Sequence, residues 1–234
     1  MEEEYNQKRI NPPIWQHDYH VLKGLYRGLN EIIDKYLKKE QKCKLLDYGC
    51  GSKPYKNLFL SYISQYIGVD ITQNPRADKI VKEDQRLPYK SEHFNIILST
   101  QVLEHVENTE FYFSECLRLL GNGGFLILST HGLWPYHPYP SDYYRWTRIG
   151  LKEMIKSRGF NIERCFSILG PFASVIQFEL LIIAERLRRL GIFGKIFLAV
   201  LSIFGNTLIW FVDKFAPPTE VSDASLFLIC AKKI

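Results

Sequence analysis

The residues with the clearest chemical potential lie at positions 45–51, which read Leu-Leu-Asp-Tyr-Gly-Cys-Gly. Two apolar residues lead into Asp47, and Gly49 and Gly51 follow with one residue between them. This pattern predicts a buried parallel strand that ends in a loop where a ligand approaches the backbone, because glycine has no Cβ to block the ligand and tolerates positive φ. Cys50, between the two glycines, is expected to be a small apolar filler rather than a reactive thiol.

A second acid follows further along the chain. Residues 66–70 form a short apolar run that ends in Asp70. An acid at the tip of the second strand of a doubly wound sheet accepts hydrogen bonds from ribose hydroxyls. Strands that alternate with helices predict a parallel sheet with right-handed crossovers. The predicted elements downstream are strands at 79–81, 94–99 and 125–128 and a helix at 110–120 with one apolar face.

Five short motifs in a fixed order carry a resemblance to a known family. They are Leu-Asp-Tyr-Gly-Cys-Gly, Gly-Val-Asp, Arg-Leu-Pro-Tyr, Val-Leu-Glu-His-Val and Leu-Leu-Gly-Asn-Gly-Gly, all within residues 43–130. Together they resemble class I S-adenosylmethionine-dependent methyltransferases, in particular the type 11 group. A nicotinamide-binding domain fits less well, because Pro54 stands where the third glycine of Gly-x-Gly-x-x-Gly belongs. The resemblance implies an α/β, Rossmann-like fold with a seven-stranded, mostly parallel sheet and helices on both faces.

The resemblance also implies S-adenosyl-L-methionine as the cofactor and assigns residues to its site. Asp47, Gly49, Cys50 and Gly51 are expected around the methionine part, and Asp70 at the ribose. Either Glu83 or Asp84 is expected near the adenine amino group, since the register of this loop allows both. The remaining expected contacts are Ile71 at the adenine, Gln85 beside the two acids, and Thr100, Gln101 and Val102 below the sulfonium.

A segment rich in aromatic residues and histidines follows the fifth predicted strand, at 131–147. Ligands bind beyond the carboxyl ends of the strands in this fold, so the segment is expected to overhang the methyl group. Methyl transfer to a hydroxyl needs a proton acceptor, and a neutral histidine is the usual one. His137 and His131 are the candidate bases, and Asp142 orients one of them, acts itself or caps a helix. The expected acceptor contacts are Trp134, Tyr136, Tyr143, Arg145 and Trp146.

Arg145 has two interpretations at this stage: it binds an acidic group on the acceptor, or it pairs with Asp142 as a structural link. The segment also resembles that of methyltransferases encoded with surface-polysaccharide biosynthesis, and aromatic faces suit a ring-shaped acceptor. The predicted function is O-methylation of a sugar hydroxyl on a surface-glycan or lipid-linked glycan precursor. The alternatives are O-methylation of a membrane quinone or other aromatic small molecule, and a non-catalytic cofactor-binding partner subunit.

Composition sets broader limits. The net charge of +5 is not concentrated in one run, so a nucleic-acid partner is not expected. Five scattered cysteines without a Cys-x-x-Cys pair, and an N-terminus without an apolar signal segment, favour a reducing, cytoplasmic location and no metal site. The 234 residues predict one methyltransferase domain: a helical cover (1–42), the cofactor-binding core (43–130), a substrate loop, helix and sixth strand (131–169), an apolar helical insertion (170–217) and the last strand (218–234).

The insertion before the last strand is unusually apolar. Residues 174–190 are predicted as a helix that becomes basic at Arg186, Arg188 and Arg189, and 196–212 are interrupted by only three polar residues. The strands on both sides must meet in one sheet, so the chain has to return to where it left. This favours a helical hairpin in the membrane interface, with peripheral contact through 174–212 at the inner face, or packing in the core or a homodimer. A transmembrane span is the least favoured interpretation, because 196–212 is at the lower length limit.

Overall fold

The computed structural model describes residues 2–38, 42–71, 74–138 and 141–234. The strands are β1 (Cys43–Tyr48), β2 (Ile63–Asp70), β3 (Lys79–Ile80), β4 (Phe94–Thr100), β5 (Leu120–His131), β6 (Phe160–Ile168) and β7 (Leu226–Lys233). The helices are α1 (Glu2–Ile10), α2 (Tyr19–Tyr36), α3 (Lys56–Phe59), α4 (Thr109–Leu119), α5 (Arg148–Ser157), α6 (Pro171–Arg188) and α7 (Gly191–Phe215), with a short 3-10 helix, η2 (Leu103–His105).

All the strands belong to one sheet of order β3-β2-β1-β4-β5-β7-β6. Strand β1 pairs in parallel with β2 and β4, and β4 pairs in parallel with β5. Strand β7 alone runs antiparallel to its neighbours, β5 and β6. The chain order reverses between β1 and β4, and the crevice beyond the carboxyl ends of such strands is where open sheets bind ligands. The predicted seven-stranded, mostly parallel sheet is confirmed.

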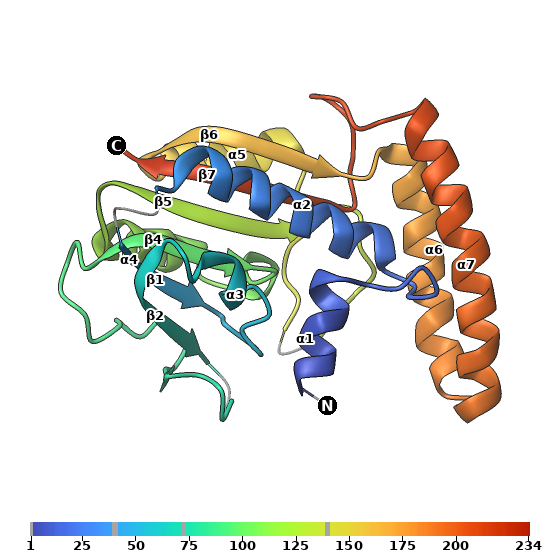
Figure 1. The fold of residues 1–234 in the computed structure, drawn as a ribbon. Coiled ribbons are helices and arrows are strands. Elements are labelled where there is room, and N and C mark those ends of the chain that lie inside the picture. Colours follow the sequence, from blue (N-terminus) through green and yellow to red (C-terminus); the bar gives the residue numbers. More distant parts are fainter. Residues whose placement is uncertain (1, 39–41, 72–73, 139–140) are drawn as a thin grey trace.

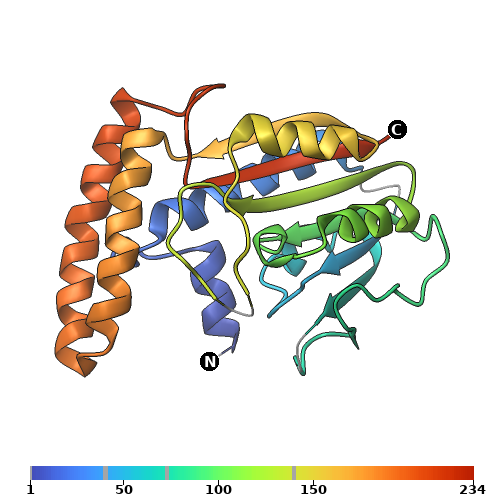
Figure 2. The same ribbon diagram turned by 180° about the vertical axis from the view of Figure 1, so that it is seen from behind.

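Helices cover both faces of this sheet because successive strand residues point to opposite sides. In β1, Leu45 joins an apolar cluster with the inner side of α2, whereas Leu46 joins a second cluster with α4 and α5. Helix α2 covers one face in Figure 1, and α4 and α5 cover the other face in Figure 2. With both faces buried, the carboxyl edge is the part of the sheet that is left to bind ligands.

Helices α6 and α7 form an antiparallel pair beyond that carboxyl edge (Figure 1). The pair begins directly after β6 at Pro171, a residue suited to a first helical turn because its missing N–H would be unpaired there. After α7 the chain returns to the sheet, where β7 lies between β5 and β6. The predicted helical insertion before the last strand is therefore confirmed. Helix α1 lies close to the same edge (Figure 1).

One local prediction differs from the structure. Residues 121–124 are absorbed into β5, whose first residue, Leu120, already pairs with Phe94. The register shifts between Phe94 and Ile96, and Gly123 takes a φ of 72°. The glycines thus form an irregular, bulge-like start to the strand rather than a separate turn. The third predicted strand, 79–81, shortens to Lys79–Ile80.

Candidate functional site

A cavity of about 1200 Å³ opens at the carboxyl edge of the sheet. Its walls come from the ends of β1, β2 and β4, from α1 and residues 16–22, from residues 131–138, and from the inner side of α6. Ligand cavities commonly measure about 300–1000 Å³. This cavity therefore has room for two ligands side by side, one at the glycine loop and one toward α6.

The glycine loop after β1 lines one end of the cavity. Gly49 has a φ of 79°, and a Cβ added there would lie 2.4 Å from Cγ2 of Val102. Gly51 has a φ of 47°, and a Cβ there would meet nothing within 4 Å. Gly49 is thus required by close packing in the protein, whereas Gly51 exposes bare backbone to the open cavity. The backbone N–H of Gly51 donates to Oδ2 of Asp70 over 3.1 Å.

Asp70, at the end of β2, is positioned from several sides. In addition to Gly51, the side-chain amide of Asn74 donates to its Oδ2 over 2.9 Å, and the backbone N–H of Ile71 donates to its Oδ1 over 2.8 Å. Ile71 lines the cavity beside it, as do Glu83 and Asp84. Asn74 was not predicted as a site residue, although an amide four residues after the acid could have been considered.

Asp47 lies behind the glycine loop rather than in the cavity wall. Its carboxylate is buried and accepts a hydrogen bond from the hydroxyl of Tyr66. Burial raises the pKa of Asp47 to about 7, because the charged form is poorly solvated there. Cys50 lines the cavity, but burial raises the pKa of its thiol to about 12, so the thiol stays protonated as expected for an apolar filler.

Gln101, just after β4, connects two parts of the site. Its backbone has a φ of 57°, an uncommon value for a residue other than glycine, and its N–H donates to the carbonyl of Ser129 over 2.9 Å. Its side-chain carbonyl accepts from the guanidinium of Arg9, on α1. Its amide nitrogen lies 3.2 Å from Nε2 of His131. The strained backbone therefore holds a polar side chain between α1 and β5.

A buried carboxylate faces the other nitrogen of His131. Nδ1 of His131 lies 2.9 Å from Oε1 of Glu104, in η2, and both side chains are almost fully buried. The hydroxyl of Thr130 donates to the second carboxylate oxygen over 2.8 Å. Burial acts to raise the pKa of Glu104, but His131, the backbone of Glu104 and the hydroxyl of Thr130 together hold that pKa below its ordinary value. Trp134 stacks on the imidazole at 4.5 Å between ring centroids, which fixes the ring plane.

His137 lies in the same group of rings. Its centroid is 5.6 Å from that of His105 and 6.3 Å from that of His131. Desolvation, and to a smaller extent the neighbouring His131 and His105, lowers the pKa of His137. Its backbone N–H donates to Asp142 over 2.6 Å.

Arg145 acts as a clasp for this loop. Its guanidinium makes a bidentate pair with Asp142, with both N···O distances at 2.5 Å, and also donates to the carbonyls of Trp134 and Pro135. Burial acts to raise the pKa of Asp142, but Arg145 and the amide of His137 hold it below its ordinary value. Of the two interpretations of Arg145, the structure shows the pairing with Asp142.

The predicted site residues therefore separate into two groups. Those that line the cavity share the carboxyl edge of the sheet or the loop after β5; they are Gly49, Cys50, Gly51, Asp70, Ile71, Glu83, Asp84, Thr100, Gln101, Val102, His131, Trp134, Tyr136 and His137. Among the residues that the structure describes, six predicted ones lie outside the lining: Asp47, Gln85, Asp142, Tyr143, Arg145 and Trp146. The Gln85 side chain instead accepts from the backbone N–H of Lys82, and Tyr143 contacts Glu107.

Several lining residues were not among the predicted site residues. Arg9 belongs to a highly charged N-terminal segment that resembles a solvated helix. His17 is partly buried in the cavity wall, where burial lowers its pKa. Its Nε2 lies 3.0 Å from a guanidinium nitrogen of Arg188, on α6. Arg186 and Arg189 line the same end of the cavity.

Comparisons with known proteins agree with this geometry. Residues 46–128 match a family described as a methyltransferase domain. This segment therefore carries a class I S-adenosylmethionine-dependent methyltransferase domain. A ubiquinone biosynthesis O-methyltransferase from Pelagibacter ubique is 25% identical to the chain over 130 residues, which are 49% of this chain and 54% of that protein. The chain thus spans about half the length of the curated relatives it matches.

Solved structures share the fold of this methyltransferase domain. The [4+2]-cyclase SpnF has a TM-score of 0.56 and 19% identity, covering 89% of this chain and 81% of its own. A phosphoethanolamine N-methyltransferase from Haemonchus contortus, solved with phosphomonomethylethanolamine and S-adenosylhomocysteine, has a TM-score of 0.56 and 15% identity, covering 99% of this chain and 59% of its own. SpnF is named as a cyclase although it shares this fold. The fold alone therefore does not decide the reaction, which depends on the residues of the site.

S-Adenosylmethionine fits the residues at the glycine-loop end. The bare backbone at Gly51 leaves open space where a Cβ would stand, and Asp70 offers a carboxylate at the end of β2. Ile71 supplies an apolar surface in the cavity wall, with Glu83 and Asp84 beside it. The predicted cofactor is confirmed for this family, whereas the resemblance to enzymes of surface-polysaccharide biosynthesis stays a prediction.

Proposed function

We propose that the protein transfers a methyl group from S-adenosylmethionine to a hydroxyl of a ring-shaped acceptor, with His131 as the general base. The observation that carries this proposal is the Glu104–His131 contact of 2.9 Å in the cavity wall. A carboxylate beside Nδ1 favours the tautomer with the proton on Nδ1, which leaves Nε2 as a proton acceptor. Trp134 fixes the ring plane of His131, and the carboxylate of Glu104 lies beside its Nδ1.

The glycine-loop end binds and orients the cofactor. Asp70 accepts hydrogen bonds from the ribose hydroxyls, and the backbone at Gly49 and Gly51 faces the methionine part. Bound there, S-adenosylmethionine supplies the methyl group as an electrophile on a positively charged sulfur. Thr100, Gln101 and Val102 form the wall between this end and the acceptor.

The proton step takes place on the acceptor side. Nε2 of His131 would take the proton of the acceptor hydroxyl during methyl transfer, for which bound S-adenosylmethionine would supply the methyl group. Glu104 stabilises the resulting imidazolium, because its negative charge lies beside Nδ1. The amide nitrogen of Gln101, 3.2 Å from Nε2, occupies the position that the acceptor hydroxyl would take, so Gln101 moves aside when the acceptor binds.

The lining of the acceptor end supports an aromatic, lipid-linked acceptor of the quinone class. Trp134 and Tyr136 offer ring faces, and Leu181 and Ile182 of α6 add an apolar wall. The names of the curated relatives, ubiquinone biosynthesis O-methyltransferases, point to the same class. A sugar hydroxyl of a lipid-linked glycan is the second candidate, since aromatic faces also suit a sugar ring. A cytoplasmic location is part of the proposal, supported by the five cysteines, all of which are free thiols.

Transfer of labelled methyl from S-adenosylmethionine tests the proposal. The wild-type protein is offered a phenol with a polyprenyl tail and, separately, a glycolipid extract, and label in the lipid fraction identifies the class. His131→Gln should lower turnover at least about 100-fold with unchanged cofactor affinity, because general-base catalysis contributes that much. The control is His93→Gln, at a surface position on the amino side of β4. Full activity of His131→Gln, or loss in His137→Gln alone, would assign the base to His137 instead.

Failure of the wild-type protein to label either acceptor while it still binds the cofactor would favour a cofactor-binding partner subunit. Calorimetric binding of S-adenosylhomocysteine by the same preparation distinguishes this outcome from a misfolded protein.

A further inference from the structure

Helix α7 has its polar side toward the protein and its apolar side outward. Ser202 and Asn206, two of its few polar residues, are fully buried, whereas Phe193 and Phe204 are 81% and 70% exposed. A helix on the surface of a water-soluble protein shows the opposite arrangement. This helix is also long and apolar enough to cross a membrane by length and composition, with a mean hydropathy of 1.9.

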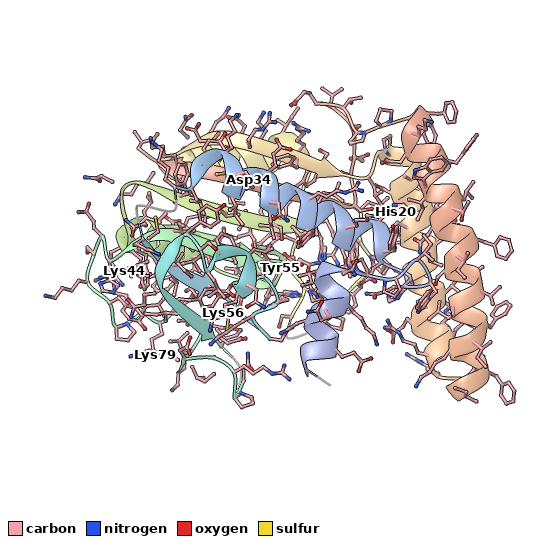
Figure 3. All side chains as sticks on the ribbon, in the orientation of Figure 1. His20, Asp34, Lys44, Tyr55, Lys56 and Lys79 are labelled. Atoms are coloured by element: carbon pink, nitrogen blue, oxygen red, sulfur yellow. The ribbon has the colours of Figure 1, made fainter. Side chains whose placement is uncertain are left out.

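The inward side of α7 is fixed to the body of the protein. The side-chain amide of Asn206 donates to the carbonyls of Ile14 and Gln16 over 2.7 and 2.8 Å. The carbonyl of Asn206 lies 2.8 Å from Nε2 of His20, which Figure 3 shows on α2 near the helix pair. These contacts secure the segment at residues 14–20 that forms part of the cavity wall. Since α7 packs on α6 and α2, it is not free to leave the protein and span a bilayer.

The outward side offers almost nothing to a hydrogen-bonding partner. Between Lys195 and Asp213, a stretch that the structure describes in full, Thr207 is the one exposed polar side chain, and its hydroxyl donates to the carbonyl of Ile203 over 2.8 Å. In the hydrocarbon of a membrane, every polar group must form its hydrogen bond within the protein, as this hydroxyl does. An interface between two proteins usually contains about one hydrogen bond per 100–200 Å² of buried area. A surface with so few hydrogen-bonding groups therefore suits lipid better than a protein partner.

We call this surface the α7 face. Its exposed apolar residues are Ile192, Phe193, Ile196, Phe197, Val200, Ile203, Phe204, Leu208, Trp210, Phe211 and Phe215.

Basic residues flank the α7 face at both ends. Lys195 lies near its start, and Lys214 near its end, 5.5 Å above the ring of Trp210. The three arginines that precede the turn between α6 and α7 line the cavity instead, and Arg189 pairs with Glu185 over 3.4 Å. The nearest acid on α7 itself, Asp213, is turned inward and accepts from the backbone N–H of Gly170 over 2.6 Å. Tryptophan and basic side chains around an apolar helix are typical of the water–lipid boundary of a membrane.

We propose that the α7 face docks the protein on an anionic lipid bilayer, with α7 lying in the plane of the headgroup region. The apolar side chains enter the boundary of the acyl chains, and the flanking lysines contact the negatively charged headgroups. At 1.5 Å per residue, the helix covers about 37 Å of membrane surface. The inner side of the pair, which lines the cavity through α6, stays with the protein.

Co-sedimentation with vesicles tests the docking surface. The full chain is mixed with vesicles of phosphatidylcholine alone or of phosphatidylcholine with phosphatidylglycerol. The wild-type protein should sediment with the mixed vesicles, and Phe197→Ser/Phe204→Ser should lower its partition coefficient at least about 100-fold, at tenfold for each lost ring. Ile149→Ser is the matched control, since Ile149 is 61% exposed on α5, away from the helix pair, and it should bind as the wild type does.

The charged rim has its own readout. Lys195→Gln/Lys214→Gln should lower binding to the mixed vesicles about 25-fold, at roughly fivefold per lysine, with little change on phosphatidylcholine alone. Brominated lipids should quench the fluorescence of Trp210, a quenching that Trp210→Phe removes. Absence of wild-type sedimentation with the mixed vesicles would overturn the proposal. So would a lipid-independent dimer in analytical ultracentrifugation that Phe197→Ser/Phe204→Ser dissociates, because the α7 face would then be occupied by a second copy of the chain.

Discussion

Replacing Glu104 with Gln isolates the contribution of the buried carboxylate to the proposed proton transfer. The side chain keeps its shape, and its carbonyl oxygen can still accept from Thr130, which lies 2.8 Å away. The new amide would face Nδ1 of His131, where the carboxylate oxygen lies at 2.9 Å. An amide donor at that place requires Nδ1 to accept, so the imidazole proton moves to Nε2 and the base is lost.

The expected loss follows from the role of the base. General-base catalysis contributes about 10²- to 10⁴-fold, so kcat should fall by that factor, or about 2.7–5.5 kcal/mol of transition-state stabilisation. The affinity for S-adenosylhomocysteine should stay unchanged, because the cofactor contacts lie at Gly51 and Asp70. The assay is methyl transfer to the acceptor over a pH range, with calorimetry for the cofactor.

The pH profile carries the sharper result. In the wild type, turnover should depend on pH through the proposed base, and in Glu104→Gln this dependence should disappear together with most of the turnover. Glu110→Gln is the matched control, since Glu110 is exposed and pairs with Arg158 over 3.3 Å at the surface. Turnover of Glu104→Gln within threefold of the wild type at every pH would refute the assignment of His131 as an oriented base.

Three further perturbations give distinct outcomes. Gly51→Ala should abolish cofactor binding in calorimetry and lower the free energy of unfolding by only about 1 kcal/mol, because the added methyl group enters open cavity space. Gly49→Ala should also abolish binding, but chemical denaturation should show a larger loss of about 1–3 kcal/mol, because the added Cβ would lie 2.4 Å from Val102. Asp47→Asn should raise the melting temperature more at pH 8 than at pH 5. The pKa of Asp47 is about 7 in the folded protein, so the wild type loses up to about 4 kcal/mol of folding free energy as the pH rises through 7 and this carboxyl ionises. Arg145→Ala should lower acceptor turnover with little effect on cofactor affinity, because it releases Asp142 and the loop carbonyls; equal losses of both would contradict the clasp.

The cofactor end was predictable from sequence because its signals are local. An apolar run, an acid and two glycines specify a strand and its loop, and Asp70 follows from the same pattern one strand later. The mostly parallel sheet followed from the alternation of elements, and the return of the chain after the helical insertion followed from the need of the strands on both sides to meet in one sheet. These features depend on residues close together in the chain.

The acceptor end was less predictable because its contacts join distant segments. Glu104 and His131 meet only because β4 and β5 are neighbours in the sheet, and sequence reasoning treated Glu104 as part of a motif without a partner. Arg9 reaches Gln101 across the cavity from a helix whose charged residues resemble a solvated surface. The apolar character of α7 was clear from its composition, but the side that faces outward depends on where Asn206 finds its partners.

The most direct test of the account is the binding of S-adenosylhomocysteine to the wild-type protein and to Asp70→Ala, measured by calorimetry. A carboxylate that accepts ribose hydroxyls contributes about 1.5–3 kcal/mol per hydrogen bond, so the account predicts tight binding by the wild type and at least about a tenfold loss in the variant. Equal affinities of the two proteins, or no binding by a folded wild type, would contradict a cofactor site at the ends of β1 and β2.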